Sequence, residues 1–340
     1  MKMKAAVLNR FHSPLELQEV PVSDLKPDEA LVAVKASGLC GSDIHIMEGK
    51  VPTVTLPFIP GHEMAGEVVR LGSDAAGLNM GDHVVSLIDI TCGSCRFCLK
   101  SRSNLCLNLK RLGFERNGSH AQFAVVPIAN LVKIPKGVPF EQAAIIPDAV
   151  SCMLHAVKVQ GKVGLGDKVV FLGIGGLGMQ GVQIAKRAGA EVYCTSRRDD
   201  KLKVASKLGA DAVINTRKQD LGAEVQSLTG GVGCDVVFDN IGTNESMKTA
   251  LSICSRGGKV VVVGYTDRTF EGDLYSLMIL EKEIIGTRAS TKADLTQAVE
   301  LVEKGLVTPY VSDTFSFEEI NDGLKKLGAG DIMGRGVLIM

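Results

Sequence analysis

Four cysteines lie close together in the sequence and carry its most specific chemical signal. Cys92, Cys95, Cys98 and Cys106 follow the spacing C-x2-C-x2-C-x7-C. Four thiolates at these distances can surround one zinc ion tetrahedrally and leave no position vacant, as a structural zinc site requires. A disulfide is less suited because two-residue spacers strain the bridge, whereas an iron–sulfur cluster is an alternative because ferredoxin-type runs also place cysteines three apart. We therefore predict a structural zinc ion at these four residues.

A second set of residues that can bind a metal precedes these cysteines in the sequence. Cys40 begins the run Cys-Gly-Ser-Asp-Ile-His, and His62 is followed directly by Glu63. A thiolate and an imidazole are two of the three protein ligands of an open zinc site, in which water or substrate takes the fourth position. Taken singly, a cysteine in an apolar setting is usually a core residue and a lone histidine a hydrogen-bonded structural one. A third ligand must come from elsewhere in the chain.

A glycine-rich turn follows the apolar run 168–172 and precedes a helical stretch at 179–187. This G-x-G-x-x-G motif in the context of strand, turn and helix predicts a dinucleotide site. Its first glycine allows the tight turn, the second lets the backbone approach a pyrophosphate, and the last lets the helix pack on the strand. The free N–H groups of the helix N-terminus face the phosphates. The residues expected to bind the cofactor are Gly173, Gly175, Gly176, Leu177 and Gly178.

The end of the second strand of such a fold indicates which dinucleotide binds. An NAD site usually has Asp or Glu there, to bind the ribose 2′-hydroxyl. This chain has Thr195 at that position, followed by Ser196, Arg197 and Arg198. A hydroxyl and guanidinium groups suit a 2′-phosphate, so we predict that NADP is preferred and that NAD is possible. The aspartates at 199–200 are expected to begin a helix.

Two patterns of secondary structure divide the chain. Up to about residue 137 we expect short strands bounded by Gly, Pro or Asp, and then a helix over 141–159. From residue 168 apolar strands alternate with helices, which is the pattern of a parallel sheet, and the tail 294–340 adds two helices and a strand at 336–340 that leave this alternation. The predicted strands are Lys4–Leu8, Glu29–Ala36, Glu63–Leu71, Ala121–Val126, Lys168–Leu172, Glu191–Cys194, Ala212–Ile214, Val236–Phe238, Lys259–Val263 and Glu283–Gly286.

Composition excludes several classes of partner. Lysine and arginine total 38, as do aspartate and glutamate, so nothing in the charge favours nucleic acid or an anionic membrane. No apolar stretch is long enough to span a bilayer. Nine cysteines without a secretion signal indicate a reducing compartment, and we expect a cytoplasmic protein.

These motifs together resemble one known family over essentially the whole chain. The run G-H-E-x2-G-x5-G-x2-A from Gly61, the cysteine lobe and the glycine-rich turn occur in the order of the zinc-containing alcohol dehydrogenases, within the medium-chain dehydrogenase/reductase superfamily. The resemblance implies an α/β fold with two domains. Residues 1–150 and 290–340 would form a GroES-like, mostly β catalytic domain with the zinc lobe at 92–106. Residues 151–289 would form a Rossmann domain with a doubly wound parallel sheet.

The resemblance also implies roles for the second set of ligand types. Cys40 and His62 would bind the catalytic zinc, with Glu63 as an outer or transient ligand. Asp148 stands at the position of the third ligand, as in microbial secondary-alcohol dehydrogenases, and Cys152 is the alternative because thiolates suit zinc well. The chain would then hold two zinc ions, one catalytic and one structural.

Further residues match the proton relay and the cofactor contacts of the family. Ser42 would accept the proton of the alcohol and pass it through the cofactor ribose to His45 near solvent. The alternative is that Ser42 and Asp43 only cap a helix. Arg335 falls where the family places an arginine on the cofactor pyrophosphate.

We therefore predict an NADP-preferring, zinc-dependent oxidoreductase acting on a small secondary alcohol or polyol, or on the matching ketone. A dehydrogenase of a hydroxylated acid or amino acid, similar to threonine dehydrogenase, is the alternative enzyme. A non-enzymatic nucleotide-binding protein and a zinc-ribbon nucleic-acid binder are disfavoured by the open metal site and by the neutral charge. The apolar strand at 257–264 and the edge strand at 283–286 predict a homodimer or homotetramer.

Overall fold

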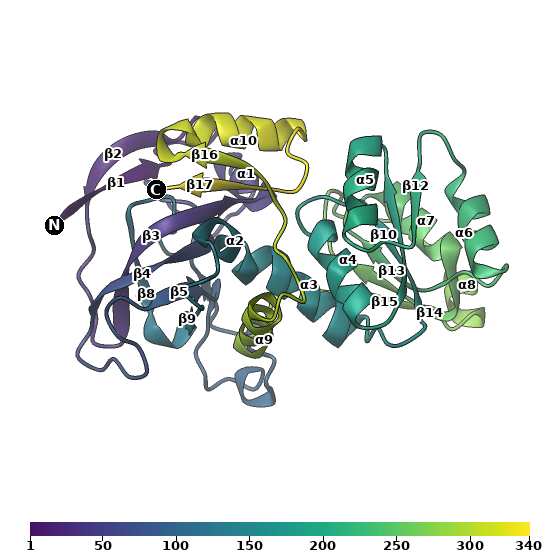
Figure 1. Cartoon of the computed structure of the whole chain (residues 1–340), viewed down its shortest axis with the longest axis horizontal. Helices are drawn as coiled ribbons and strands as arrows, with labels where there is room; N and C mark the ends of the chain where they lie inside the picture. The colour runs from purple at the N-terminus through teal and green to yellow at the C-terminus, as the bar shows by residue number, and fades with distance from the viewer. The chain divides into compact units, whose positions relative to one another are not determined.

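The computed structural model describes residues 1–340 and divides the chain into two compact units. The first unit contains Met1–Ser151 and Ala289–Met340, and the second contains Cys152–Arg288. The C-terminal segment returns to the first unit because its last strand, β17 (Arg335–Ile339), pairs antiparallel with β3 (Glu29–Leu39) (Figure 1).

A seven-stranded sheet is the centre of the first unit, with the order β16-β17-β3-β4-β5-β9 and with β8 also paired to β3. The strand β3 is buried on both faces and is rich in Val and Ala, which suits a strand with neighbours on every side. Two two-stranded ribbons, β1–β2 and β6–β7, lie beside it. The remaining strands are β1 (Lys2–Val7), β2 (Glu16–Pro21), β4 (Glu63–Leu71), β5 (His83–Ser86), β6 (Asp89–Ile90), β7 (Lys110–Arg111), β8 (Phe123–Pro127), β9 (Leu131–Lys133) and β16 (Val311–Ser316).

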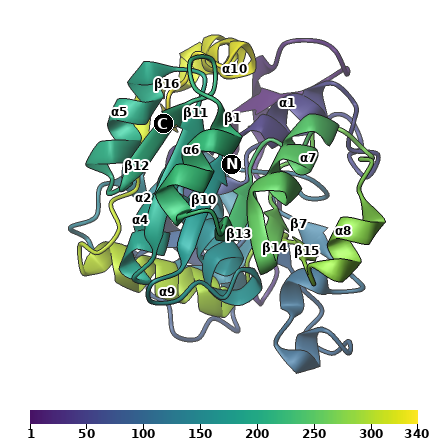
Figure 2. The ribbon, with the colours of Figure 1, turned by 90° about the vertical axis from the view of Figure 1, so that its right-hand side faces the viewer.

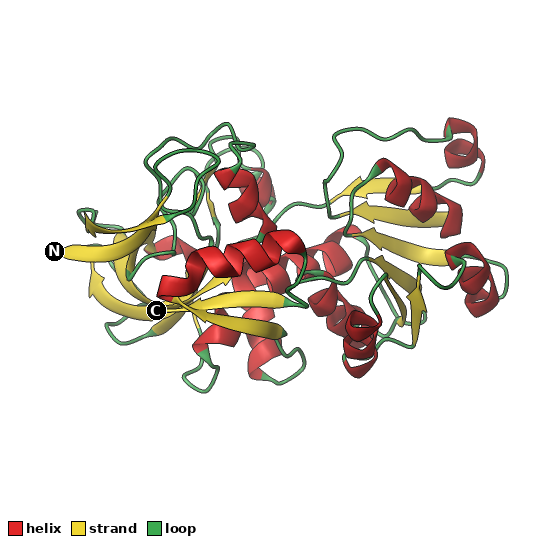
Figure 3. Cartoon of the chain, turned by 90° about the horizontal axis from the view of Figure 1, so that it is seen from above, coloured by secondary structure: helices red, strands yellow, loops and turns green.

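Helices cover parts of this sheet. The helix α10 (Ile320–Ala329) packs against β3, β16 and β17, as Figure 3 also shows. Its Ile320 and Leu324 join an apolar cluster with Leu39 and Leu338. The other helices of this unit are α1 (Gly41–Met47), α2 (Phe140–Ala144) and α9 (Lys292–Glu303), with short 3₁₀ turns at Cys98–Lys100, Ser103–Leu105, Ile128–Asn130 and Phe317–Glu319.

The single helix expected over 141–159 is instead a series of different helical turns. After α2 come a π-helix at Ile146–Val150, the short α-helix α3 (Ser151–Leu154) and a second π-helix at His155–Gln160. Pro147 lies in the first π-helix. A proline inside a helix has no N–H to donate and its ring crowds the carbonyl four residues earlier, so a wider turn relieves the conflict.

The second unit is a parallel sheet of six strands in the order β12-β11-β10-β13-β14-β15 (Figure 2). The order runs outward from β10 in one direction and from β13 in the other, so β10 and β13 flank the topological switch point where such folds bind ligands. The strands are β10 (Lys168–Leu172), β11 (Glu191–Ser196), β12 (Ala212–Asn215), β13 (Cys234–Asp239), β14 (Cys254–Val262) and β15 (Glu283–Gly286).

Helices pack on both faces of this sheet because the side chains of each strand alternate. Val170 packs with Met247 and Ile253 in one cluster. The neighbouring Phe171 points to the opposite face of the sheet and lies against Gly181 of the helix α4. The helices are α4 (Gly178–Arg187), α5 (Asp199–Lys207), α6 (Leu221–Thr229), α7 (Asn244–Ile253) and α8 (Leu274–Ile279). None of the helices in the chain combines the length and apolar character needed to cross a membrane.

Candidate metal centre and dinucleotide site

Four residues predicted from the sequence meet at one end of the first unit's sheet. The ligand atoms of Cys40, His62, Glu63 and Asp148 all lie within 4.8 Å of one another. Cys40 follows β3 and His62 precedes β4, and the two strands pair antiparallel with Gly38 opposite Glu63. A Cβ atom at Gly38 would lie 2.1 Å from Glu63 Oε2, so this glycine makes room for the Glu63 side chain.

The first π-helix brings Asp148 to this group. Asp148 is the third residue of the π-helix Ile146–Val150, directly after Pro147. Its carboxylate Oδ2 lies 3.7 Å from Cys40 Sγ. Single π-helical turns are frequent at functional sites because the wider turn reorients side chains. Cys152, the alternative ligand, lies in α3 and is not a member of the group.

The electrostatics of the group are those of a buried anionic site. Cys40 and Glu63 are buried, and burial raises the pKa of the Cys40 thiol to about 11, although the positive charge of Arg335 acts to lower it. Burial likewise raises the pKa of Glu63 well above its usual value. Removing a charge from water is costly unless a counter-charge compensates for it. A cation at this point would therefore stabilise the thiolate and carboxylate forms.

The donor set fits an open zinc site. One sulfur, one imidazole and one carboxylate are the donor types of catalytic zinc, and Glu63 offers a second carboxylate. Glu63 Oε1 pairs with Arg335 and His62 Nδ1 faces Asp43, whereas Glu63 Oε2 is buried and accepts no hydrogen bond. Polar atoms left in this state call for a partner such as an ion.

Asp43, which the sequence analysis names as a possible helix cap, lies beside this group. Its Oδ1 is 3.8 Å from His62 Nδ1, and its Oδ2 accepts a 2.9 Å hydrogen bond from the backbone N–H of Cys40. Cys40 is the N-cap of α1, which begins at Gly41, and Asp43 completes a capping box as the third helical residue. Burial would raise the pKa of Asp43, but the neighbouring imidazoles of His120 and then His62 outweigh burial, and the pKa is lowered.

Ser42 and His45 lie one turn apart on α1. Ser42 Oγ is 3.8 Å from Cys40 Sγ, which places the hydroxyl beside the group of ligand atoms. The His45 side chain is 35% exposed, and its Nδ1 lies 3.9 Å from a Glu48 carboxylate oxygen. Residues three apart share a helix face. The pair therefore extends from the ligand group toward the surface.

Arg335, the first residue of β17, lies beside the ligand group. Its side chain is 7% exposed and forms ion pairs with Glu63 and Asp148. The pairing of β17 with β3 places Gly336 opposite Leu39, so the arginine at the start of β17 lies beside the end of β3. A guanidinium between two carboxylates already has its counter-charges. The structure thus shows Arg335 in contact with the ligand group, and its contact with a cofactor pyrophosphate stays a prediction.

The four clustered cysteines form a second group of ligand atoms, also within 4.8 Å of one another. The sulfur atoms of Cys95 and Cys98 are 3.6 Å apart, and those of Cys92 and Cys106 are 3.5 Å apart. A disulfide requires about 2.05 Å, whereas two sulfurs bound tetrahedrally to one zinc are about 3.8 Å apart. The separations fit a shared ion better than a bridge, and all four cysteines are free thiols.

The glycine-rich turn has the geometry of a phosphate-binding loop. Gly173 has φ +81°, a left-handed conformation that favours glycine. A Cβ atom at Gly178 would lie 2.7 Å from the Gly173 carbonyl oxygen, whereas at Gly175 it would meet nothing within 4 Å. The helix α4 begins at Gly178, after Gly176 and Leu177. The loop is thus tightly closed at its ends and open in the middle.

The end of β11 leaves one of its two arginines unpaired. The Arg198 guanidinium donates to Asp200, with 3.1 Å from Nε to Oδ1, and the Ser196 hydroxyl accepts from the Arg198 N–H. Arg197 is exposed and takes part in none of the structure's hydrogen bonds or ion pairs. Thr195 is buried, and its hydroxyl oxygen lies 3.3 Å from the N–H of Gly173.

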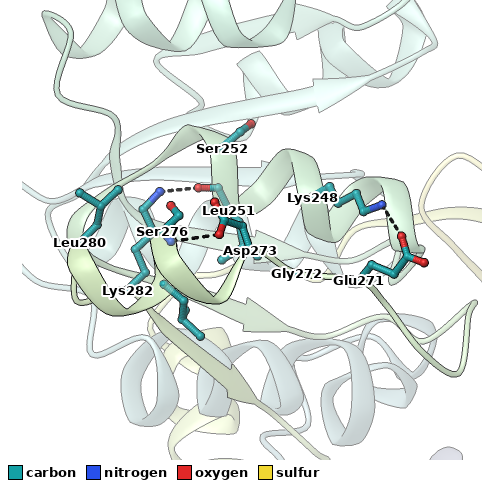
Figure 4. A pocket seen from close by; sticks show the side chains of 10 residues that line it. Lys248, Leu251, Ser252, Glu271, Gly272, Asp273, Ser276, Leu280 and Lys282 are labelled. Atoms are coloured by element: carbon teal, nitrogen blue, oxygen red, sulfur yellow. Dashed lines mark hydrogen bonds and ion pairs between the residues drawn. The ribbon is translucent and has the colours of Figure 1, made fainter.

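A cavity of about 620 Å³ in the second unit contains none of the predicted site residues. Figure 4 shows that its cations already have partners. Lys248 Nζ lies 3.0 Å from a Glu271 oxygen, and Lys282 Nζ donates to the Leu251 carbonyl at 2.6 Å. Both lysines of this cavity are therefore already paired.

Comparison with known proteins confirms the expected resemblance and fold class. Residues 26–136 match the family described as "Alcohol dehydrogenase GroES-like domain", and residues 176–304 match the family described as "Zinc-binding dehydrogenase". Each match falls largely within one of the two units. Together they include the four clustered cysteines and the second half of the glycine-rich turn.

Individual relatives match over nearly the full length. An alcohol dehydrogenase from Geobacillus stearothermophilus is 34% identical over 338 residues, which are 99% of each chain. A D-arabitol-phosphate dehydrogenase from Enterococcus avium is 32% identical over 293 residues, 85% of this chain and 83% of the relative. The solved structure of an NAD-dependent alcohol dehydrogenase matches with a TM-score of 0.95 at 31% identity, covering 99% of this chain and 100% of that one.

Proposed function

The chain belongs to the zinc-containing alcohol dehydrogenase family and is an oxidoreductase, and we propose that it transfers hydride between NADP and a small secondary alcohol or polyol, or the matching ketone. The observation that carries this proposal is the convergence of Cys40, His62, Glu63 and Asp148 next to the Ser42 hydroxyl. A binding protein has no need of an open metal site beside a hydroxyl that can accept a proton.

In this proposal Cys40, His62 and Asp148 hold the catalytic zinc, and Glu63 is an outer or transient ligand. A zinc ion bound there supplies a Lewis acid that makes an alcohol hydroxyl far more acidic. Ser42 accepts the proton of the alcohol, and His45 releases it toward solvent from the exposed end of the same helix face. Arg335 balances the charge of Glu63 and Asp148.

The test is a panel of secondary alcohols, polyols, hydroxy acids and ketones, followed by cofactor absorbance. We expect turnover of an alcohol or ketone that is lost in Asp148→Ala and retained in Cys152→Ala. Both variants should still bind NADP(H), because the glycine-rich turn lies in the second unit. An active Asp148→Ala together with an inactive Cys152→Ala would assign the third ligand to Cys152, and turnover of hydroxy acids alone would favour the alternative enzyme.

A second zinc ion is proposed for the cysteine lobe. Cys92, Cys95, Cys98 and Cys106 supply four sulfur donors and leave no open position, so this ion would stabilise the lobe without taking part in the reaction. Metal analysis of the purified protein should then approach two zinc equivalents per chain.

We also propose that two or four copies assemble. The strand β15 is the last of its sheet and has one edge unpaired within the chain. Next to it in sequence, α8 exposes Leu274, Tyr275 and Met278, with exposed fractions of 78%, 70% and 65%. An open strand edge beside exposed apolar side chains favours association with a second copy, which would extend the sheet.

A further inference from the structure

A single buried carboxylate lies between two imidazoles behind the proposed catalytic zinc site. Asp43 and His120 are fully buried, and His62 is 2% exposed. Asp43 Oδ1 lies 3.8 Å from His62 Nδ1, and Asp43 Oδ2 lies 3.6 Å from His120 Nε2. Three of these atoms, Asp43 Oδ1, His62 Nδ1 and His120 Nε2, have no hydrogen-bond partner. His120 thus approaches Asp43 from the side opposite to the proposed metal ligand.

The second ring nitrogen of His120 lies within hydrogen-bond distance of a hydroxyl. His120 Nδ1 is 2.9 Å from Ser37 Oγ, which is in turn 2.7 Å from Ser119 Oγ. Ser119 Oγ donates to the Glu63 carbonyl at 3.4 Å, so Ser37 donates to Ser119 and accepts from His120 Nδ1, while Nε2 of the ring faces Asp43. His62 Nδ1 likewise faces Asp43, which leaves the Nε2 of His62 for a metal.

The backbone is shaped to bring His120 to this position. Gly61 has φ +96°, and a Cβ atom there would lie 2.6 Å from His120 Nδ1. Cβ atoms at Gly113 and Gly118 would lie 2.4 Å and 2.0 Å from the Gly61 carbonyl oxygen. The His120 N–H also donates to the Pro60 carbonyl. The segment before His120 therefore lies directly against the residue that precedes His62.

We infer that His120 is a positioning residue of the catalytic metal centre: with His62 it holds Asp43 from two sides, and Asp43 in turn orients His62 toward the zinc. The inference rests on the proposed zinc site. Outer partners of metal-bound histidines fix the tautomer and the ring orientation, and their loss typically lowers metal affinity about 10- to 100-fold. Asp43 Oδ2 also accepts the hydrogen bond from the Cys40 N–H, and His120 adds a side-chain partner on this same oxygen.

The experiment compares zinc binding in three variants of the full chain. His120→Phe keeps an aromatic ring but removes both nitrogens, and His120→Gln keeps a side-chain N–H donor. His83→Phe is the matched control, because His83 is a half-buried histidine of β5 that packs on Phe140 and belongs to neither ligand group. Zinc affinity is measured by competition with a chromophoric chelator, and the geometry of the site by the visible absorption of Co²⁺.

We expect His120→Phe to bind the more weakly held zinc about 10- to 100-fold less tightly, with an altered Co²⁺ spectrum. His120→Gln should recover most of this loss, and His83→Phe should resemble the wild type. Wild-type affinity and spectrum in His120→Phe would overturn the inference, as would an equal loss in His120→Phe, His120→Gln and His83→Phe. If His120→Phe fails to fold, His120→Leu, which also removes both nitrogens, takes its place, and wild-type zinc affinity with an unchanged Co²⁺ spectrum in that variant would overturn the inference.

Failure of the proposed function gives a different result. In that case the wild-type protein itself would bind a single zinc equivalent and turn over no alcohol or ketone. Failure of the inference alone leaves a wild type with two zinc equivalents and full activity, and a His120→Phe variant with the same zinc affinity.

Discussion

Replacing Arg197 with alanine should weaken the preference for NADPH over NADH. Arg197 is exposed at the end of β11 and has no partner in the protein, whereas the guanidinium of Arg198 is already bound to Asp200. A hydrogen bond to a charged group contributes roughly 1.5–3 kcal/mol. Because Arg197 is exposed to solvent, its contact with the 2′-phosphate should contribute about 1.5 kcal/mol to the binding of NADPH. We therefore expect the preference to fall about tenfold.

The measurement is the ratio of kcat/KM for NADPH to kcat/KM for NADH. Arg198→Ala is the matched control and should change this ratio less than about twofold, because it removes an arginine that already has a protein partner. The wild-type ratio should also decrease as salt is added, since contacts between exposed charges are screened within about 10 Å at 0.1 M.

A second change tests the strand end itself. Thr195 is buried with its hydroxyl against the Gly173 N–H, so Thr195→Asp would place a carboxylate at the edge of the glycine-rich turn. Combined with Arg197→Ala, it should bring the ratio below one, because the carboxylate repels a 2′-phosphate and binds a 2′-hydroxyl. A wild-type ratio below one, or an unchanged ratio in Arg197→Ala, would refute the reasoning.

Three further predictions concern the lobe, the relay and assembly. Cys98→Ser should release about one zinc equivalent and lower the thermal unfolding temperature, because binding of a structural metal is coupled to folding; unchanged metal content and stability would contradict the structural site. Ser42→Ala should lower kcat about 10²-fold or more while zinc content stays at the wild-type level, as expected for a lost proton acceptor; a wild-type rate would remove Ser42 from the relay. Light scattering at micromolar concentration should give at least two chains per particle, and Met278→Glu on the exposed face of α8 should shift the protein toward monomer; a wild-type monomer would count against assembly.

Features set by local spacing could be predicted from the sequence. The alternation of strands and helices after residue 168 predicted a parallel sheet, and β4, β10 and β15 begin and end where their apolar patterns do. The clustered cysteines and the glycine-rich turn are also local, because short spacers bring their atoms together whatever the rest of the chain does. The π-helical turns around Pro147 were not predicted, because the pattern of apolar residues looks the same in either kind of turn.

Relations between distant residues were decided only by the tertiary structure. Arg335 lies beside Glu63 and Asp148 because the C-terminal strand returns to pair with β3. His120 faces Asp43 because three glycines let two loops approach closely, and no spacing in the sequence indicates this contact. The sequence by itself therefore determined the family, the fold class and the candidate ligands. Which charges and imidazoles surround those ligands depends on strand pairing and loop packing, since these bring together residues that are far apart along the chain.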